Sequence, residues 1–287
     1  MNRIGLFGLI AAGGVLAYQQ TRSTGSSLAY PGLVASVLDS TTPKLHASGD
    51  ALVPPSYPWS HTHPWQAFDR ASVRRGYEVY KASCAQCHSL SHLYYRSLVG
   101  TVLTEAEAKA EAAEIDVEDG PNEDGEMFDR PGKLTDPLPK PYANEEQARA
   151  SNNMAYPPDL SLIQQARTHH EDYIFALLTG YRAPPVGVEL PENMYYNPYF
   201  LGGQIGMAQA LKTGIIDYED GTEASISQMA KDVSVFLTWA ANPEQDDRKK
   251  MGIKAIFLFA LMAIPSLYWK KYKWSVVKTR QVRVVKK

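Results

Sequence analysis

The eight-residue stretch SCAQCHSL (residues 83–90) holds the only two cysteines of the 287-residue chain. In a Cys-x-x-Cys-His run each thiol adds to one vinyl group of a porphyrin, because two intervening residues let the sulfurs of Cys84 and Cys87 reach adjacent pyrrole rings. The histidine that follows, His88, then lies under the iron as its proximal ligand. The run therefore predicts one covalently bound haem c.

Two other uses of a cysteine pair remain at this point. A redox dithiol is expected at the start of a helix inside a βαβ unit, and the flanking sequence shows no such strand pattern. A structural zinc site normally takes four ligands from two such pairs, and the chain has no second pair.

Two helices are predicted to flank the middle of the chain. Asp69 can cap a helix whose apolar stripe contains Val73, Tyr77, Tyr80 and Cys84, and this stripe leads into the haem motif. Near the other end, Ser225 to Gln228 form a capping box. The face that follows is apolar: Met229, Val233, Phe236, Leu237 and Ala240.

Gly76 on the first helix lacks a side chain and would let the two helices cross closely. Two crossing helices beside a haem, joined by loops, are the plan of a small cytochrome c. We therefore expect a mainly α fold, a cytochrome c-like haem domain with long irregular insertions, and one C-terminal transmembrane helix.

The middle of the chain is rich in residues that interrupt regular structure. Residues 101–150 are predicted to be an irregular insertion, because glycines and prolines recur there: Gly120, Pro121, Pro131, Gly132, Pro137, Pro139 and Pro141. Asp172 to Thr179 has a short helical pattern that ends at Gly180.

Charge is segregated along the chain although the net charge is only -2. Between Glu105 and Asp129, eleven residues are Asp or Glu and only Lys109 is basic, whereas Lys270 to Lys287 contain eight Lys or Arg and no acid. An acidic run is commonly a solvated loop, and it can also steer a basic partner.

Ile253 to Trp269 form a mostly apolar stretch that would rise about 26 Å as a helix. A buried core helix has the same composition, but the aromatic residues and cations that follow are typical of a membrane anchor. The larger number of cations beyond this stretch places the C-terminus in the matrix or cytoplasm. Met1 to Tyr18 resemble a sorting segment with a basic start and a glycine-rich apolar run.

The sixth ligand of the iron determines the class of function. Haem c with one protein ligand binds external molecules, and a second protein ligand makes it an electron carrier. Met207 stands among flexible glycines that allow a close approach to the macrocycle. The pair His169 and His170 is its main rival.

The chain resembles the cytochrome c1 family, the haem subunits of the mitochondrial ubiquinol-cytochrome c oxidoreductase, or bc1 complex. The similarity runs in the family's order from about residue 50 to the end. The matching stretches are PPSYPWSH (54–61), VRRGYEVYKASCAQCHSL (73–90), GPNEDGEMFDRPGKL (120–134), PPDLSLI (157–163), EDYIFALLTGY (171–181), NPYFLGGQIGMA (197–208), YEDGTEASISQMAKDVSVFLTWA (218–240) and KWSVVKTR (273–280).

The resemblance implies roles for individual residues. Met207 takes the position of the family's sixth ligand, Arg167 that of an arginine at a haem propionate, and Tyr173 that of a tyrosine lining the haem pocket. Asn152, Pro157 and Pro158 match other pocket residues. The chain departs from the family at His169 and His170, where glycines are expected, and at Leu201, where proline is usual.

The resemblance also implies a function and a location. The electron would come from the Rieske iron-sulfur protein and pass through haem c to soluble basic cytochrome c, and the complex, a dimer with cytochrome b, would couple this transfer to quinol oxidation and proton translocation. No quinol chemistry on this chain and no nucleic-acid partner are expected. The acidic docking residues would be Glu118, Asp119, Glu123 and Asp124.

The expected organisation has four parts in the mitochondrial inner membrane. They are a sorting or extension segment (1–50), a haem domain in the intermembrane space (51–246), a single-pass anchor (247–272) and a basic matrix-side tail (273–287). Two other classes of protein fit the residues: a membrane-anchored haem enzyme or gas sensor with a labile sixth ligand, and a purely structural assembly subunit.

Overall fold

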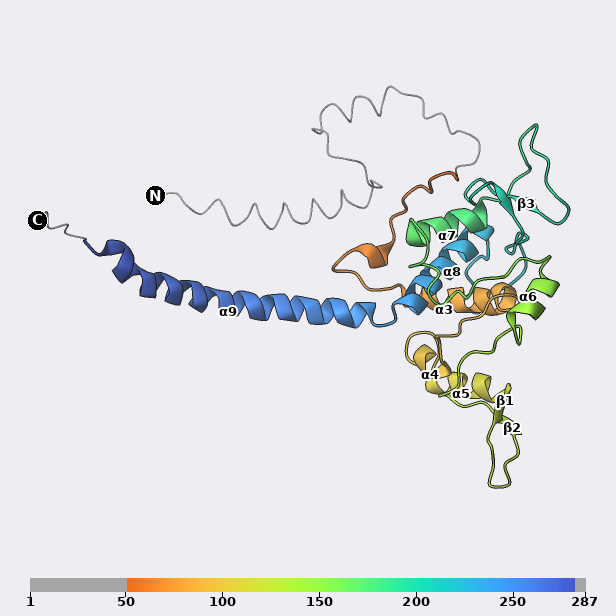
Figure 1. Ribbon diagram of the computed structural model, residues 1–287, viewed down its shortest axis with the longest axis horizontal. Coiled ribbons are helices and arrows are strands. Elements are labelled where there is room, and N and C mark those ends of the chain that lie inside the picture. The colour runs from red at the N-terminus through yellow and green to blue at the C-terminus, as the bar shows by residue number, and fades with distance from the viewer. Residues whose placement is uncertain (1–50, 282–287) are drawn as a thin grey trace, which may run out of the picture. The chain divides into compact units, whose positions relative to one another are not determined.

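A computed structural model describes residues 51–281, which form a mainly helical unit with little sheet (Figure 1). The expected sorting segment and the end of the basic tail lie outside the described residues. The helices are η1 (Ser60–Thr62, 3-10), α3 (Arg70–Val79), η2 (Tyr80–Cys84, a π-helix), α4 (Tyr95–Leu98), α5 (Glu105–Ala113), α6 (Glu145–Ser151), α7 (His170–Thr179), α8 (Ile226–Ala241) and α9 (Gln245–Thr279). The strands are β1 (Asp116–Asp119), β2 (Phe128–Pro131), β3 (Tyr195–Tyr196) and β4 (Gln204–Ile205).

Helix α3 begins where the sequence predicts. The carboxylate of Asp69 accepts hydrogen bonds from the Ala71 amide at 3.1 Å and the Ser72 hydroxyl at 2.8 Å, which satisfies an amide that has no partner inside the helix. Val73, Tyr77 and Tyr80 are buried, so the predicted stripe faces the core.

Helix α8 is also confirmed, with one difference at its start. The Ser225 side chain caps the Gln228 amide at 3.2 Å, but the Gln228 side chain donates to Asp232 at 2.8 Å instead of returning to the cap. Only half of the predicted capping box forms, because the Ser225 amide, which would donate to the Gln228 side-chain oxygen, donates to the Glu223 carbonyl at 3.0 Å instead.

The two helices cross at Gly76, as predicted. A Cβ atom on Gly76 would lie 2.1 Å from the Asp232 carbonyl oxygen and 2.6 Å from the Phe236 Cβ, so no other residue fits without moving a backbone. Arg75 donates to the buried Asp232 carboxylate at 2.8 and 3.2 Å, which pairs the one charge that α8 places in the contact. Helix α7 packs against the same α8.

The insertion is more regular than the sequence predicts. Helix α5 forms before the first interrupting residue, because Thr104 and Glu107 make a complete capping box. Strands β1 and β2 pair as an antiparallel hairpin around the turn that contains Gly120 and Pro121. The prediction of an irregular stretch was therefore wrong for these elements and for α6, which Asn144 caps by accepting from the Gln147 amide, whereas residues 132–143 follow it.

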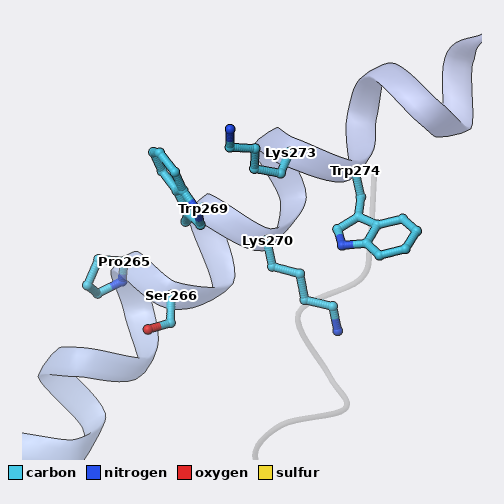
Figure 2. Close-up of a pocket in the computed structure, with 6 residues that line it drawn as sticks. All are labelled: Pro265, Ser266, Trp269, Lys270, Lys273 and Trp274. Carbon is cyan, nitrogen blue, oxygen red and sulfur yellow. The ribbon is translucent and has the colours of Figure 1, made fainter.

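Helix α9 is the one helix within residues 51–281 that is long and apolar enough to cross a membrane. Its apolar side chains are exposed in the described chain, so the alternative of a buried core helix is not supported. Near its end Trp269 and Lys273 project from one side of the helix and Lys270 and Trp274 from another, around a shallow groove (Figure 2). The Lys273 ammonium lies 5.1 Å from the centre of the Trp269 ring. Such mixed aromatic and basic side chains suit the boundary between lipid and water.

The start of α9 is bonded to η1 and to the loop after it. The Lys249 ammonium donates to the carbonyl oxygens of His61, His63 and Gln66 at 2.6, 3.0 and 2.8 Å. The Asp246 carboxylate accepts from the Phe68 amide at 3.3 Å. The expected division at residue 246 thus falls inside α9, whose first turns are held by the haem domain.

Candidate haem site

The helix that carries the Cys-x-x-Cys-His run changes its hydrogen-bond pattern as it enters the motif. The Ala85 amide donates to the Tyr80 carbonyl at 2.9 Å, a π-type bond, and the Cys87 and His88 amides both donate to the Cys84 carbonyl at 3.1 and 2.9 Å. Such widened turns are frequent at functional sites. This one brings both free thiols and the imidazole into a single compact turn.

The ring of His88 is held by a backbone carbonyl. Its Nδ1 lies 2.7 Å from the Pro158 oxygen, and because a carbonyl only accepts, the proton must be on Nδ1. The lone pair of Nε2 is then free for a metal, which is the tautomer that an axial ligand needs. Burial lowers the pKa of His88, although Pro158 and Asp159 oppose this shift.

Asp159 fixes the segment that contains Pro158, and sequence reasoning missed it. Its carboxylate accepts from the Ser89 hydroxyl at 2.7 Å and from the Ser91 and Ser161 amides, both at 2.8 Å. Burial raises the pKa of Asp159, but these hydrogen bonds outweigh it and hold the pKa at about 2. The carboxylate therefore stays charged and ties residues 157–161 to the residues that follow the motif.

Met207 comes from a short hairpin. Strands β3 and β4 pair, and the loop between them turns through Gly202 and Gly203, both with positive φ near 75° (79° and 72°), which favour glycine. Gly206 then passes close to neighbouring side chains, with a virtual Cβ 3.4 Å from the Ala155 Cβ. Met207 is half-buried and packs against the same core as Cys84.

The other expected pocket residues are brought together only in part. Arg167 lies beside the Tyr173 hydroxyl: burial raises the pKa of Tyr173 and the guanidinium lowers it. Asn152 instead donates to the Tyr142 hydroxyl at 2.9 Å and the Ala148 carbonyl at 2.7 Å, which ends α6. Within the described residues no hydrogen bond links Asn152 or Pro157 to residues 83–90.

The two histidines at which we expected the chain to depart from the resembled family have left-handed backbones. His169 and His170 have φ values of 65° and 48°, a region in which glycine costs least. The Nδ1 of His170 lies 3.0 Å from the Gln164 carbonyl oxygen and donates to it. In the described part of the chain no hydrogen bond joins either histidine to the haem motif.

The four expected docking residues lie on the β1–β2 hairpin. Glu118, Glu123 and Asp124 are exposed and form no ion pair within residues 51–281, whereas Asp119 is bound by Arg130. Arg130 also binds Asp136 at 2.7 Å. Glu118 stands directly across from Asp129 in the strand pair, and two like charges in this arrangement repel each other.

The side chains at the site fit a haem c better than the alternatives. Burial raises the pKa of the Cys84 thiol to about 12, with a smaller contribution from Cys87, whereas a redox dithiol needs a lowered pKa. Within residues 51–281 no three His, Cys, Asp or Glu side chains are placed to hold a metal ion, so zinc finds no ligand set there. Two thiols, an imidazole with a free Nε2 and a thioether are the donors that haem c takes.

A Cys-x-x-Cys-His turn at the end of α3, crossed by α8 and followed by one long apolar helix, defines a c-type cytochrome with a candidate membrane anchor. Comparison with known proteins agrees: residues 59–277 match the Cytochrome C1 family. The chain is 55% identical over 228 residues to the Arabidopsis thaliana protein "Cytochrome c1 2, heme protein, mitochondrial", covering 79% of this chain and 74% of the relative.

Two fungal relatives are similar over a comparable length. The chain is 51% identical over 257 residues to the Candida albicans "Cytochrome b-c1 complex catalytic subunit, mitochondrial" (88% of this chain, 89% of the relative). It is 50% identical over 242 residues to the Saccharomyces cerevisiae "Cytochrome c1, heme protein, mitochondrial" (84% and 78%). The chain belongs to the cytochrome c1 family, and its cofactor is haem c.

Proposed function

We propose that this chain is the electron-transfer subunit of a dimeric bc1 complex, in which it accepts an electron from the Rieske iron-sulfur protein and passes it to soluble cytochrome c. Quinol oxidation and proton translocation belong to the complex and its cytochrome b. The single observation that carries the proposal is the His88 ring, held by Pro158 in the tautomer of an axial ligand within a Cys-x-x-Cys-His turn.

Each residue of the site has a task in this proposal. Cys84 and Cys87 hold the haem by thioether bonds, and His88 and Met207 are the axial ligands. Asn152, Pro157, Pro158, Arg167 and Tyr173 line the pocket. Bound there, haem c carries one electron by cycling between ferric and ferrous iron. With haem c bound, His88 and Met207 would both hold the iron, so the chain would leave no ligand position for a substrate and the haem would serve one-electron transfer.

Replacing Met207 by lysine tests this assignment. An amine is a harder ligand than a thioether and favours ferric iron, so the midpoint potential should fall by an amount on the order of hundreds of millivolts while the iron stays six-coordinate. His170→Ala is the matched control and should leave the potential unchanged. An unchanged potential in Met207→Lys together with a collapse in His170→Ala would assign the ligand role to the histidine pair.

Carbon monoxide distinguishes this function from that of a haem enzyme or gas sensor. The reduced parent protein should resist carbon monoxide because the thioether occupies the sixth position. Rapid binding to the parent would favour a labile site and a different function.

The charges on the β1–β2 hairpin support our proposal that the electron passes to a soluble, basic cytochrome c. Three exposed carboxylates without ion pairs in the described chain, with Glu118 opposite Asp129, form a surface whose self-repulsion decreases when a cation approaches. A basic cytochrome c would therefore be steered toward the hairpin, in a fast encounter that salt weakens.

Neutralising Glu118, Glu123 and Asp124 together tests the steering. Asp119 is left intact because Arg130 binds it and its loss would disturb the fold. The second-order rate of cytochrome c reduction should fall and lose its salt dependence, most clearly below about 0.15 M ionic strength, where screening acts over roughly 8 Å.

A control removes the same charge elsewhere. Glu189, Glu192 and Glu223 are exposed and lie outside the hairpin, so their neutralisation should change the rate less. Equal rates and equal salt slopes for the parent and the hairpin variant would show that the acidic residues of the hairpin are merely solvated and do not steer cytochrome c.

We place α9 across the mitochondrial inner membrane, with the haem domain in the intermembrane space and the basic end in the matrix. The aromatic and basic groove of Figure 2 and the eight cations of residues 270–287 support this orientation. Protease added to inner-membrane vesicles of known orientation should cut the basic tail only from the matrix face. Cleavage of the tail from the opposite face would reverse the topology.

A further inference from the structure

Two hydroxyl groups hold the chain segment that begins at Met207. The Tyr181 hydroxyl donates to the Met207 carbonyl oxygen at 3.0 Å, and the Ser83 hydroxyl donates to the Ala210 carbonyl oxygen at 3.0 Å. Tyr181 follows the end of α7, and Ser83 directly precedes Cys84. The segment is thus bonded on one side to the residues that follow α7 and on the other to the residue that precedes the haem-attachment turn.

The segment has little else to hold its backbone. Within residues 51–281 no backbone–backbone hydrogen bond involves residues 207–211, which lie in no helix or strand. Leu211 is fully buried and fixes the far end of the segment in the core, so the backbone without hydrogen bonds of its own is the part nearest Met207. The two side-chain hydrogen bonds are therefore the polar restraints on the backbone that carries Met207.

Tyr181 is itself fixed in place. Gly180 allows the sharp turn before it, since a Cβ there would lie 2.6 Å from the Ala176 carbonyl oxygen and 2.6 Å from the Tyr199 ring. On its other side, the Arg182 amide donates to the Tyr196 carbonyl of β3 at 3.4 Å. Burial, with Tyr173 and Tyr195 nearby, raises the pKa of Tyr181, so its hydroxyl remains a donor.

We propose that Tyr181 and Ser83 are positioning residues for the Met207 thioether. They act on the backbone and do not touch the iron. By holding the segment they keep the sulfur at the sixth position and limit the fraction of protein in which that position is open. This inference rests on the proposed axial role of Met207.

Imidazole binding to the ferric holoprotein in detergent measures the open fraction, because imidazole enters only when the thioether has left. Its apparent affinity rises in proportion to that fraction. Tyr181→Phe and Ser83→Ala should each raise the apparent affinity roughly threefold to tenfold, the worth of one hydrogen bond. Ser83→Thr keeps the hydroxyl and should restore the parent affinity.

A matched control is available on the same hairpin. Tyr195 lies near Tyr181, and its hydroxyl makes no hydrogen bond in the described chain, so Tyr195→Phe should bind imidazole like the parent. The absorption band for charge transfer from thioether sulfur to ferric iron gives a second measurement. It should weaken in Tyr181→Phe and Ser83→Ala and persist in the control.

The outcomes separate this inference from the function on which it rests. If both variants bind imidazole like the parent and keep the band, the positioning role is overturned and Met207 remains the ligand. If the parent itself lacks the band, and Met207→Ala leaves imidazole binding unchanged, the axial role of Met207 fails first. Should Tyr181→Phe not fold, Ser83→Ala and Ser83→Thr still decide the question.

Discussion

Replacing Gly76 by alanine should destabilise the haem domain, because α3 and α8 touch at this residue. The new Cβ would lie 2.1 Å from the Asp232 carbonyl oxygen, and ordinary contact begins at 3.4 Å, so the helices must separate by about 1.3 Å. Both obstructing groups, this carbonyl and the Phe236 Cβ, belong to a helix and cannot rotate away. Separation also stretches the hydrogen bonds between Arg75 and Asp232.

The size of the effect follows from two opposing contributions. Overpacking of a core costs about 1–3 kcal/mol, and a backbone obstruction places Gly76→Ala near the upper end. Alanine regains about 1 kcal/mol over glycine through its helix preference. The net loss in free energy of unfolding is about 2 kcal/mol, which lowers the melting temperature of a domain of this size by about 4–8 °C.

Thermal unfolding of the full chain in detergent, followed by circular dichroism, measures this loss. Gly252→Ala is the matched control, because it is the same substitution in a helix with no atom within 4 Å of the new Cβ. It should leave the melting temperature unchanged or slightly higher. An equal melting temperature for Gly76→Ala and the parent would refute the close-crossing argument.

Three further predictions concern the acid stability, the junction with α9 and the attachment of haem. Burial raises the pKa of Glu171, but the His61 imidazole 3.7 Å away and the Gln164 amide, which donates at 2.8 Å, outweigh it and hold the pKa at about 2. A depressed pKa stabilises the fold only above the unfolded value, so about 2 kcal/mol should be lost between pH 5 and pH 3. Urea unfolding of Glu171→Gln should lack this loss. Lys249→Met should speed amide hydrogen exchange in residues 61–68 about tenfold, because the hydrogen bonds from Lys249 hold this segment. Lys250→Met loses only an exposed ion pair with Asp247 and should not change the exchange rate. Equal exchange rates in the two variants would show that Lys249 does not hold residues 61–68 to α9. Cys84→Ser should keep a single, weaker haem attachment on denaturing electrophoresis, and haem extracted from the parent by acidified acetone would exclude covalent binding.

The helices that position the site were predictable because they have local signals. The N-cap residues Asp69 and Ser225 indicate where α3 and α8 start. The apolar residues that recur every 3.6 positions indicate the buried faces of these helices. Helix α5 was missed for the opposite reason. Its buried face consists of Ala108 and Ala112, which produce almost no contrast between apolar and polar sides.

The proposed ligands of the haem and the residues that support them differ in how much the sequence reveals. Cys84, Cys87 and His88 are proposed from spacing alone, but the proposal of Met207 needed the family resemblance, since a single methionine has no pattern. Asp159, Tyr181 and Ser83 were not found. Their hydrogen bonds join residues 70, 26 and 127 positions apart, and such contacts depend on the folded chain.

The guanidinium of Arg130 forms ion pairs with acidic residues at the strands of the β1–β2 hairpin but with none at its tip, within residues 51–281. The root is the pair of strands: there Arg130 of β2 binds Asp119 at the end of β1 and Asp136 beyond β2, so charge is balanced and any change of these residues would loosen the fold. At the tip, Glu123 and Asp124 are exposed, and no such bond constrains their side chains within residues 51–281. The tip could therefore lengthen, shorten or exchange its acidic residues over evolutionary time while the root stays fixed, which would let the attraction for a partner be retuned without a cost in stability.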